Sequence, residues 1–134
     1  MSTSSLPLLL VIAHDADLRD FYRSLFESNG WAVAAVPAPD PTMAWVRAYQ
    51  PTAVVLDVSS EAQADPGVDY VRRLRDDRTT VDLPVVFCTA ALGLAERRRE
   101  QLAGLDARLL STPFDLEDLI SALPQPSHRI RRDA

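Results

Sequence analysis

Residues 8–30 read LLLVIAHDADLRDFYRSLFESNG. The run from Leu8 to Ala13 is apolar throughout and has the length of a buried strand. From Asp17 to Asn29 the apolar residues recur at helical spacing, and Gly30 then provides a helix stop. This stretch therefore predicts a strand followed by an amphipathic helix, which is the repeating unit of an α/β domain.

The same order of strand and helix recurs along the chain. Further strands are predicted at 32–36, 53–57, 85–88 and 107–110. Further helices are predicted from Asp40-Pro41 to Tyr49, from Gly67 to Asp76, from Leu94 to Ala103, and from an N-cap at Asp115 to Leu123, with a long polar loop at 58–66. Because each strand is nearly continuous in apolar residues, we predict an α/β fold with a doubly wound, five-stranded parallel sheet and helices on both faces.

Composition and charge narrow the class of protein. The 134 residues fit one domain, which we place at 1–123, followed by a flexible tail at 124–134. The net charge of −5 argues against nucleic acid as a partner. Cys88 is the only cysteine and no apolar run approaches the ~20 residues of a membrane span, so we expect a cytoplasmic protein without a membrane contact. Met1 and the short tail favour a stand-alone protein.

Function is sought at the carboxyl ends of the strands, because doubly wound sheets bind ligands there, near the topological switch point. Asp57 directly ends the third predicted strand, so its carboxylate belongs to this edge. The residues that the sequence places along the edge are Ala13, His14, Asp15, Asp57, Thr89 and the turn from Ser111 to Pro113.

Three strand-end motifs together carry a family resemblance. They are Leu56-Asp57, Phe87-Cys88-Thr89-Ala90, and Pro113-Phe114-Asp115-Leu116-Glu117-Asp118-Leu119. In this order and spacing they resemble the receiver domain of bacterial two-component response regulators, over about residues 6–123. The resemblance implies a flavodoxin-like fold and transfer of a phosphoryl group from a histidine kinase to an aspartate.

The resemblance also implies a set of groups with distinct chemical tasks. Two adjacent acids after the first strand help to hold Mg²⁺, which neutralises charge on the transferring phosphoryl group. A lysine after the fifth strand pairs with the phosphate, and a hydroxyl after the fourth donates a hydrogen bond to it. On this sequence Asp57 takes the phosphoacceptor position, Thr89 the switch hydroxyl position, and Pro113 the position of the proline that follows the lysine.

The sequence departs from the family pattern at four positions. Ala13 and His14 stand where the acid pair is expected, Thr112 replaces the lysine, and Leu109 replaces the switch aromatic residue. All fourteen basic residues are arginine, so no realignment restores an ammonium group. A lone carboxylate cannot readily gather both a metal cation and an incoming dianion, so we predict a degenerate receiver, a pseudo-receiver.

The remaining strand-end residues have structural explanations. We expect Asp15 to cap the following helix rather than to replace a metal ligand. His14 is expected to hydrogen-bond Asp57 rather than to bind zinc with it, and Thr89 and Thr112 to satisfy their hydroxyls within turns. We therefore expect no metal site and no cofactor, and Mg²⁺ only in a working phosphoacceptor.

Three functions remain open at this point. The first is a signal-transduction module that acts through protein contacts, independently of phosphorylation and without enzymatic activity. The second is a slow phosphoacceptor of a phosphorelay that phosphorylates and dephosphorylates itself at Asp57. The third, a flavin binder, is disfavoured because residues 13–17 lack glycine and hydroxyl side chains that would cradle a phosphate.

The expected partner is a sensor kinase or a downstream regulator. The resemblance places its contact on the fourth helix, the fifth strand and the fifth helix. A homodimer is a further expectation, in which the arginines at 97–99 face Glu117 and Asp118 across a two-fold axis.

Overall fold

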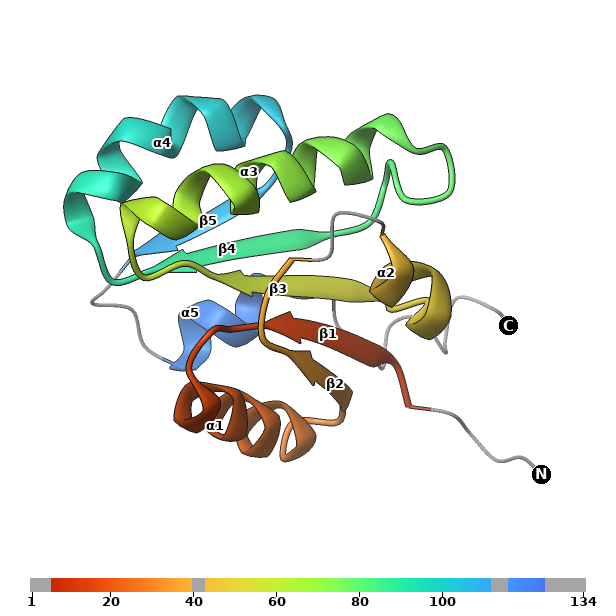
Figure 1. The fold of residues 1–134 in the computed structure, drawn as a ribbon. Coiled ribbons are helices and arrows are strands. Elements are labelled where there is room, and N and C mark those ends of the chain that lie inside the picture. The colour runs from red at the N-terminus through yellow and green to blue at the C-terminus, as the bar shows by residue number, and fades with distance from the viewer. Residues whose placement is uncertain (1–5, 40–42, 112–115, 125–134) are drawn as a thin grey trace.

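The computed structural model describes residues 6–39, 43–111 and 116–124, and its elements alternate between strand and helix (Figure 1). In chain order they are β1 (Leu8–Ile12), α1 (Ala16–Glu27), β2 (Ala32–Val36), α2 (Ala44–Tyr49), β3 (Ala53–Asp57), α3 (Glu61–Asp76), β4 (Val85–Thr89), α4 (Leu92–Gly104), β5 (Arg108–Ser111) and α5 (Leu116–Ser121). The five strands form one parallel sheet in the order β2-β1-β3-β4-β5. The predicted fold is confirmed.

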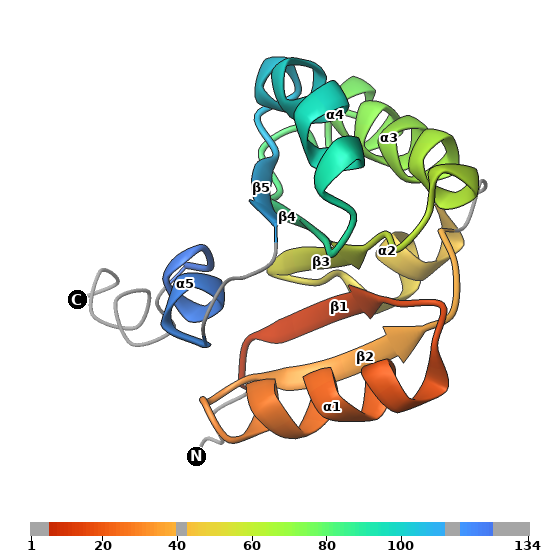
Figure 2. The same ribbon diagram turned by 90° about the vertical axis from the view of Figure 1, so that its left-hand side faces the viewer.

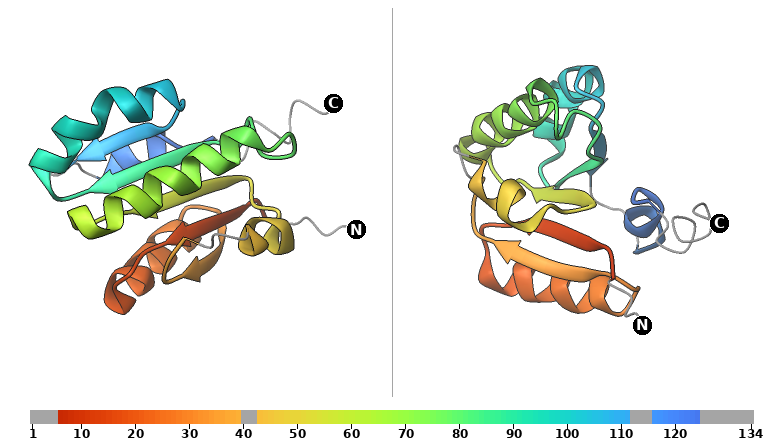
Figure 3. Two further views of the ribbon diagram at one scale, coloured as in Figure 1. Left: turned by 45° about the horizontal axis from the view of Figure 1, so that its top comes forward. Right: turned by 90° about the vertical axis from the view of Figure 1, so that its right-hand side faces the viewer.

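The strands bury both of their faces because successive side chains point to opposite sides of the sheet. Leu10, Val54 and Phe87 belong to a core cluster with α2, α3 and α4, whereas Leu9 and Val55 belong to a second cluster with α1 and α5. Figure 2 shows α3 and α4 on the opposite side of the sheet from α1, and the right view of Figure 3 places α5 away from α3 and α4. This double coverage explains the continuous apolar runs in the sequence.

The first helix begins as predicted. The Asp15 side chain accepts a hydrogen bond of 2.8 Å from the backbone N–H of Asp17, which satisfies one of the free donors at the start of α1. The helix buries the rings of Tyr22 and Phe26, whose centroids lie 5.8 Å apart in a stacked arrangement. Gly30 follows the helix with a φ of 94°, a conformation that glycine adopts without steric cost.

The third helix begins six residues earlier than predicted, at Glu61, so the expected long polar loop at 58–66 is wrong. The prediction treated Pro66 as a helix boundary, but Pro66 lies inside α3 on an exposed position. Its missing N–H removes one helical hydrogen bond, and burial of Ala64 and Gly67 against the sheet offsets this cost. Gly67 permits that approach, since a Cβ there would lie 3.1 Å from Cγ2 of Val58.

The second helix begins at Ala44, not at Asp40-Pro41 as expected from the capping pattern. Met43 precedes it with a φ of 64° and is buried in the core. Burial of this side chain thus overrides the local cap signal.

Asp40, Pro41 and the expected cap Asp115 lie outside the described residues, as does most of the expected tail. Among the described helices, none is long and apolar enough to cross a membrane.

Candidate functional site

Asp57 ends β3 at the carboxyl edge of the sheet, where it pairs in register with Cys88 of β4. Its carboxylate is half-buried, and Oδ2 accepts a hydrogen bond of 2.7 Å from the hydroxyl of Tyr22. Tyr22 comes from α1 and is only 3% exposed, so the bond reaches Asp57 from within the core. This partner was not predicted from the sequence, because Tyr22 belongs to the apolar face of its helix. The hydroxyl of Tyr22 could have indicated a polar contact, since buried tyrosine hydroxyls usually find a partner.

The electrostatic setting of Asp57 opposes its ionisation. Burial raises the pKa of the Asp57 carboxyl, the hydrogen bond from Tyr22 lowers it, and the negative charge of Asp15 raises it again. Burial also raises the pKa of the Tyr22 hydroxyl, and nearby Cys88 and Asp57 add to that rise. Tyr22 therefore stays protonated and acts as a donor toward Asp57. Burial together with the charge of Asp57 raises the pKa of Cys88 to about 12, which keeps its thiol neutral as well.

Neither residue at the acid-pair positions supplies a carboxylate that could bind a metal. Ala13 is buried in the core, and its N–H donates a 3.0 Å hydrogen bond to the carbonyl of Val36. His14 is exposed and makes no hydrogen bond to Asp57, so that prediction is wrong. Tyr22 makes the bond instead, and an exposed imidazole avoids the cost of losing its water.

The turn between β1 and α1 is held by two side chains. One Nη of Arg19 donates to the carbonyls of Ala13 and His14, at 2.8 and 2.9 Å. The carboxylate of Asp15 is engaged as the helix cap, as predicted. Among the described residues, no group of three or more His, Cys, Asp or Glu side chains is arranged to hold a metal. With Asp15 used as a cap and one oxygen of Asp57 bonded to Tyr22, the described residues of this edge do not fit a magnesium site.

Two other family positions lie on the described part of the edge. Thr89 is buried, and its Oγ1 accepts a 3.0 Å hydrogen bond from the N–H of Ala91, as expected for a hydroxyl satisfied within a turn. Leu109 is half-buried in β5 and packs against the α3 and α4 cluster. Thr112 and Pro113 lie outside the described residues.

A cavity of about 160 Å³ opens beside Asp57 at this edge. It lies between the ends of β1 and β3, the segment after β2, and the first turns of α3. Most of its lining is apolar and includes Pro37, Pro39 and Pro66, whereas the polar lining residues are His14, Asp57 and Gln63.

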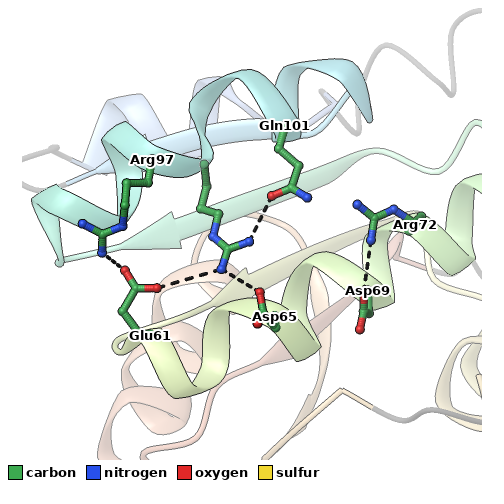
Figure 4. Close-up of polar contacts among 7 residues, drawn as sticks. Glu61, Asp65, Asp69, Arg72, Arg97 and Gln101 are labelled. Carbon is green, nitrogen blue, oxygen red and sulfur yellow. Dashed lines mark hydrogen bonds and ion pairs between the residues drawn. The ribbon is translucent and has the colours of Figure 1, made fainter.

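Two of the three arginines at 97–99 in α4 contact acids of α3 within the chain (Figure 4). Arg97 forms an ion pair with Glu61 of α3. Arg98 contacts Asp65 at 2.6 Å and Glu61 at 3.9 Å, and its side chain is only 20% exposed. These two arginines thus have acidic partners within the chain, and their contact with a second copy stays a prediction. Arg99 remains 55% exposed, next to Glu96 of its own helix.

The sequence was compared with family models and with curated proteins. No family model matches the sequence. The chain is 31% identical over 113 residues to the response regulator Rre1 of a Synechocystis species, which covers 83% of this chain and 47% of the relative. The chain thus spans about half the length of the curated relative that it matches.

Solved structures share the fold. The Vibrio cholerae chemotaxis protein CheY4 superposes with a TM-score of 0.72 at 15% identity, covering 87% of this chain and 95% of the other. The receiver domain of the Francisella response regulator 1452 gives 0.70 at 21% identity, covering 96% and 99%. The receiver domain of HemR from Leptospira biflexa gives 0.68 at 24% identity, covering 87% and 90%.

Proposed function

Because this chain belongs to the receiver domains of response regulators, we propose that it transmits signals through protein contacts without phosphorylation of Asp57. The observation that carries the proposal is the 2.7 Å hydrogen bond from the buried Tyr22 hydroxyl to Asp57, at a carboxylate with no acid pair beside it. In this proposal the domain works in the cytoplasm, needs no cofactor and has no enzymatic activity.

Charge supplies the physical reason. Phosphoryl transfer to a carboxylate brings two negative groups together, so it needs a cation that neutralises the developing charge. At this edge Ala13 and His14 supply no carboxylate, Asp15 is occupied as a helix cap, and the chain contains no lysine. On this proposal Asp57 therefore has neither the acid pair that would hold a metal nor the ammonium group that would stabilise a phosphoryl group.

The face formed by α4, β5 and α5 is the proposed contact surface, and a sensor kinase or a downstream regulator is the proposed partner. Glu117 and Asp118 are exposed in the first turn of α5, and Arg99 is exposed on α4. A second copy of the chain is a further proposed partner of this face, which presents Arg97 and Arg99, with side chains that are 60% and 55% exposed. Charge reversal in Arg99→Glu is then expected to weaken self-association in sedimentation, and an unchanged mass would remove the dimer from the proposal.

The test of phosphorylation independence uses beryllofluoride, a phosphoryl mimic, together with millimolar Mg²⁺. We expect no change in the amide NMR spectrum of the wild-type chain. The matched variant Ala13→Asp/His14→Asp/Thr112→Lys restores the groups that the family resemblance implies, and it is expected to bind the mimic. Magnesium-dependent binding by the wild type that disappears in Asp57→Asn would contradict the proposal.

A slow phosphoacceptor is the second candidate function. It is favoured by the position of Asp57 at the end of β3, with Oδ1 free of any hydrogen bond among the described residues. Thr89 also lies at the neighbouring strand end. This alternative requires the mimic to bind the wild-type chain at Asp57, so the same titration separates the two functions.

A further inference from the structure

The cavity beside Asp57 lies at the topological switch point of the sheet. Chain connections leave β1 and β3 toward opposite faces there, since α1 covers one face and α3 the other. Open α/β sheets bind their ligands in this crevice, beyond the carboxyl ends of the strands. The cavity volume of about 160 Å³ is close to that of an engineered protein cavity of about 150 Å³ that holds benzene. It therefore has room for a ligand of about six heavy atoms.

The lining combines apolar sides with one acidic group. Pro37, Pro39 and Pro66 contribute rigid apolar surface. Gln63 is tied back, because its Oε1 accepts hydrogen bonds from the N–H and the hydroxyl of Ser59, at 2.9 and 3.1 Å. His14 also lines the cavity, and the carboxylate of Asp57 is the acidic group of the lining.

Asp57 is oriented by Tyr22 and has unused bonding capacity. The bond from Tyr22 takes Oδ2, and Oδ1 has no hydrogen-bond partner in the described part of the chain. A carboxylate accepts several hydrogen bonds, and a charged donor forms stronger ones than a neutral donor. An ammonium group offers three such donors on a compact head, whereas an anion would be repelled.

We propose that this cavity binds a small primary alkylammonium ion, with its ammonium group against Oδ1 of Asp57 and its short alkyl chain against the prolines. Burial raises the pKa of Asp57, and a bound cation would stabilise the charged form that burial opposes. The inference uses the unmodified carboxylate, so it does not depend on whether Asp57 can also be phosphorylated.

The experiment is an amide NMR titration of the unmodified full chain with n-butylammonium chloride at constant ionic strength. We expect saturable shifts in the millimolar range at residues 12–14, 37–39 and 56–58. n-Butanol has nearly the same shape without the charge, and it is expected to bind at least about tenfold more weakly.

Two variants separate a specific site from general attraction by negative charge. Asp57→Asn is nearly isosteric, and it is expected to weaken n-butylammonium binding by about tenfold or more. Asp82→Asn removes the same charge from an exposed residue before β4, at the opposite edge of the sheet, and is expected to change binding by less than about twofold. The spectra of both variants also report whether they remain folded.

Three results would overturn the proposal. They are the absence of saturable shifts in the wild type, equal binding of n-butanol, and equal weakening by the Asp57 and Asp82 substitutions. If Asp57→Asn does not fold, n-butanol binding as tight as that of the ammonium ion still contradicts the proposal.

Discussion

A charged side chain lies at each edge of the sheet, and the two differ in how many hydrogen bonds they form. At the amino edge, Arg75 of α3 donates hydrogen bonds of 2.7 to 3.5 Å to the backbone carbonyls of Thr80, Val81, Leu83, Leu105 and Asp106. At the carboxyl edge, Asp57 accepts one hydrogen bond, from Tyr22. The guanidinium joins the end of α3 to the turn before β4 and to the turn before β5, whereas Asp57 faces a cavity.

This contrast assigns a structural role to Arg75 and a functional role to Asp57. The donors of Arg75 are used on the backbone carbonyls of two turns, so the residue has little capacity left for a ligand. Asp57 is partly desolvated and incompletely bonded, an arrangement that costs stability and is typical of functional sites. The following substitutions test this difference.

The largest effect is expected at Arg75. Arg75→Met leaves several carbonyls without their charged donor, and we expect the free energy of unfolding to fall by about 3 kcal/mol in urea denaturation. Arg75→Lys keeps the charge but lacks the planar fork, so it should recover only part of this loss. The control Arg78→Met changes an exposed arginine nearby and should alter stability by less than about 0.5 kcal/mol. Equal effects at the two positions would show that the hydrogen bonds of Arg75 carry no stability.

A smaller loss is expected at Tyr22. Tyr22→Phe removes the hydroxyl and leaves the half-buried carboxylate of Asp57 without its donor, at a cost of about 1 to 2 kcal/mol. Because the Tyr22 bond lowers the pKa of Asp57, its removal should raise that pKa further, as measured by carboxyl NMR titration. In Asp57→Asn the same Tyr22→Phe change should have a smaller effect, since no charge is left stranded. An unchanged pKa in Tyr22→Phe would mean that the bond does not act on the carboxylate.

Asp57→Asn is expected to change stability in the opposite direction. Burial raises the pKa of Asp57 in the folded chain, so between the unfolded and folded pKa values the folded state binds more protons. The wild type therefore loses stability as the pH rises through this interval, and the variant does not. At neutral pH the variant should be more stable by less than the Tyr22 loss, and the gain should vanish below the ordinary aspartate pKa. Lower stability of the variant at neutral pH would contradict this expectation.

The smallest effect is expected in the contact between α3 and α4. Arg98→Gln removes the pairs with Glu61 and Asp65, whose side chains are 51% and 76% exposed. Exposed ion pairs contribute about 0 to 1 kcal/mol, and salt screens them. The loss should therefore be below about 1 kcal/mol and should shrink at high salt in thermal unfolding. A loss comparable to that of Arg75→Met would place this helix contact among the main determinants of stability.

The sequence predicted most of the fold because strands buried on both faces appear as continuous, local apolar runs. The five apolar runs became the five strands, and Asp15 became the cap of α1. The starts of α2 and α3 could not be predicted in the same way, since burial of Met43 and Ala64 outweighed the local signals of Asp40-Pro41 and Pro66.

The site was only partly predictable for a related reason. The strand-end position of Asp57 follows from local pattern, whereas its bond to Tyr22 spans 35 residues of sequence. His14 was expected to fill that role because it is adjacent to the strand end, but position along the chain does not determine which side chain reaches the carboxylate. The contact of Arg98 with Asp65, 33 residues away, was missed for the same reason.

The most direct test of the account is the intact mass of the purified wild-type chain after incubation with acetyl phosphate and millimolar Mg²⁺. Without neighbouring acids or a lysine, Asp57 is expected to gain no phosphoryl group. Asp57→Asn provides the baseline, and the variant Ala13→Asp/His14→Asp/Thr112→Lys serves as the chain with restored groups. A stoichiometric, magnesium-dependent mass gain in the wild type that is absent from Asp57→Asn would contradict the account.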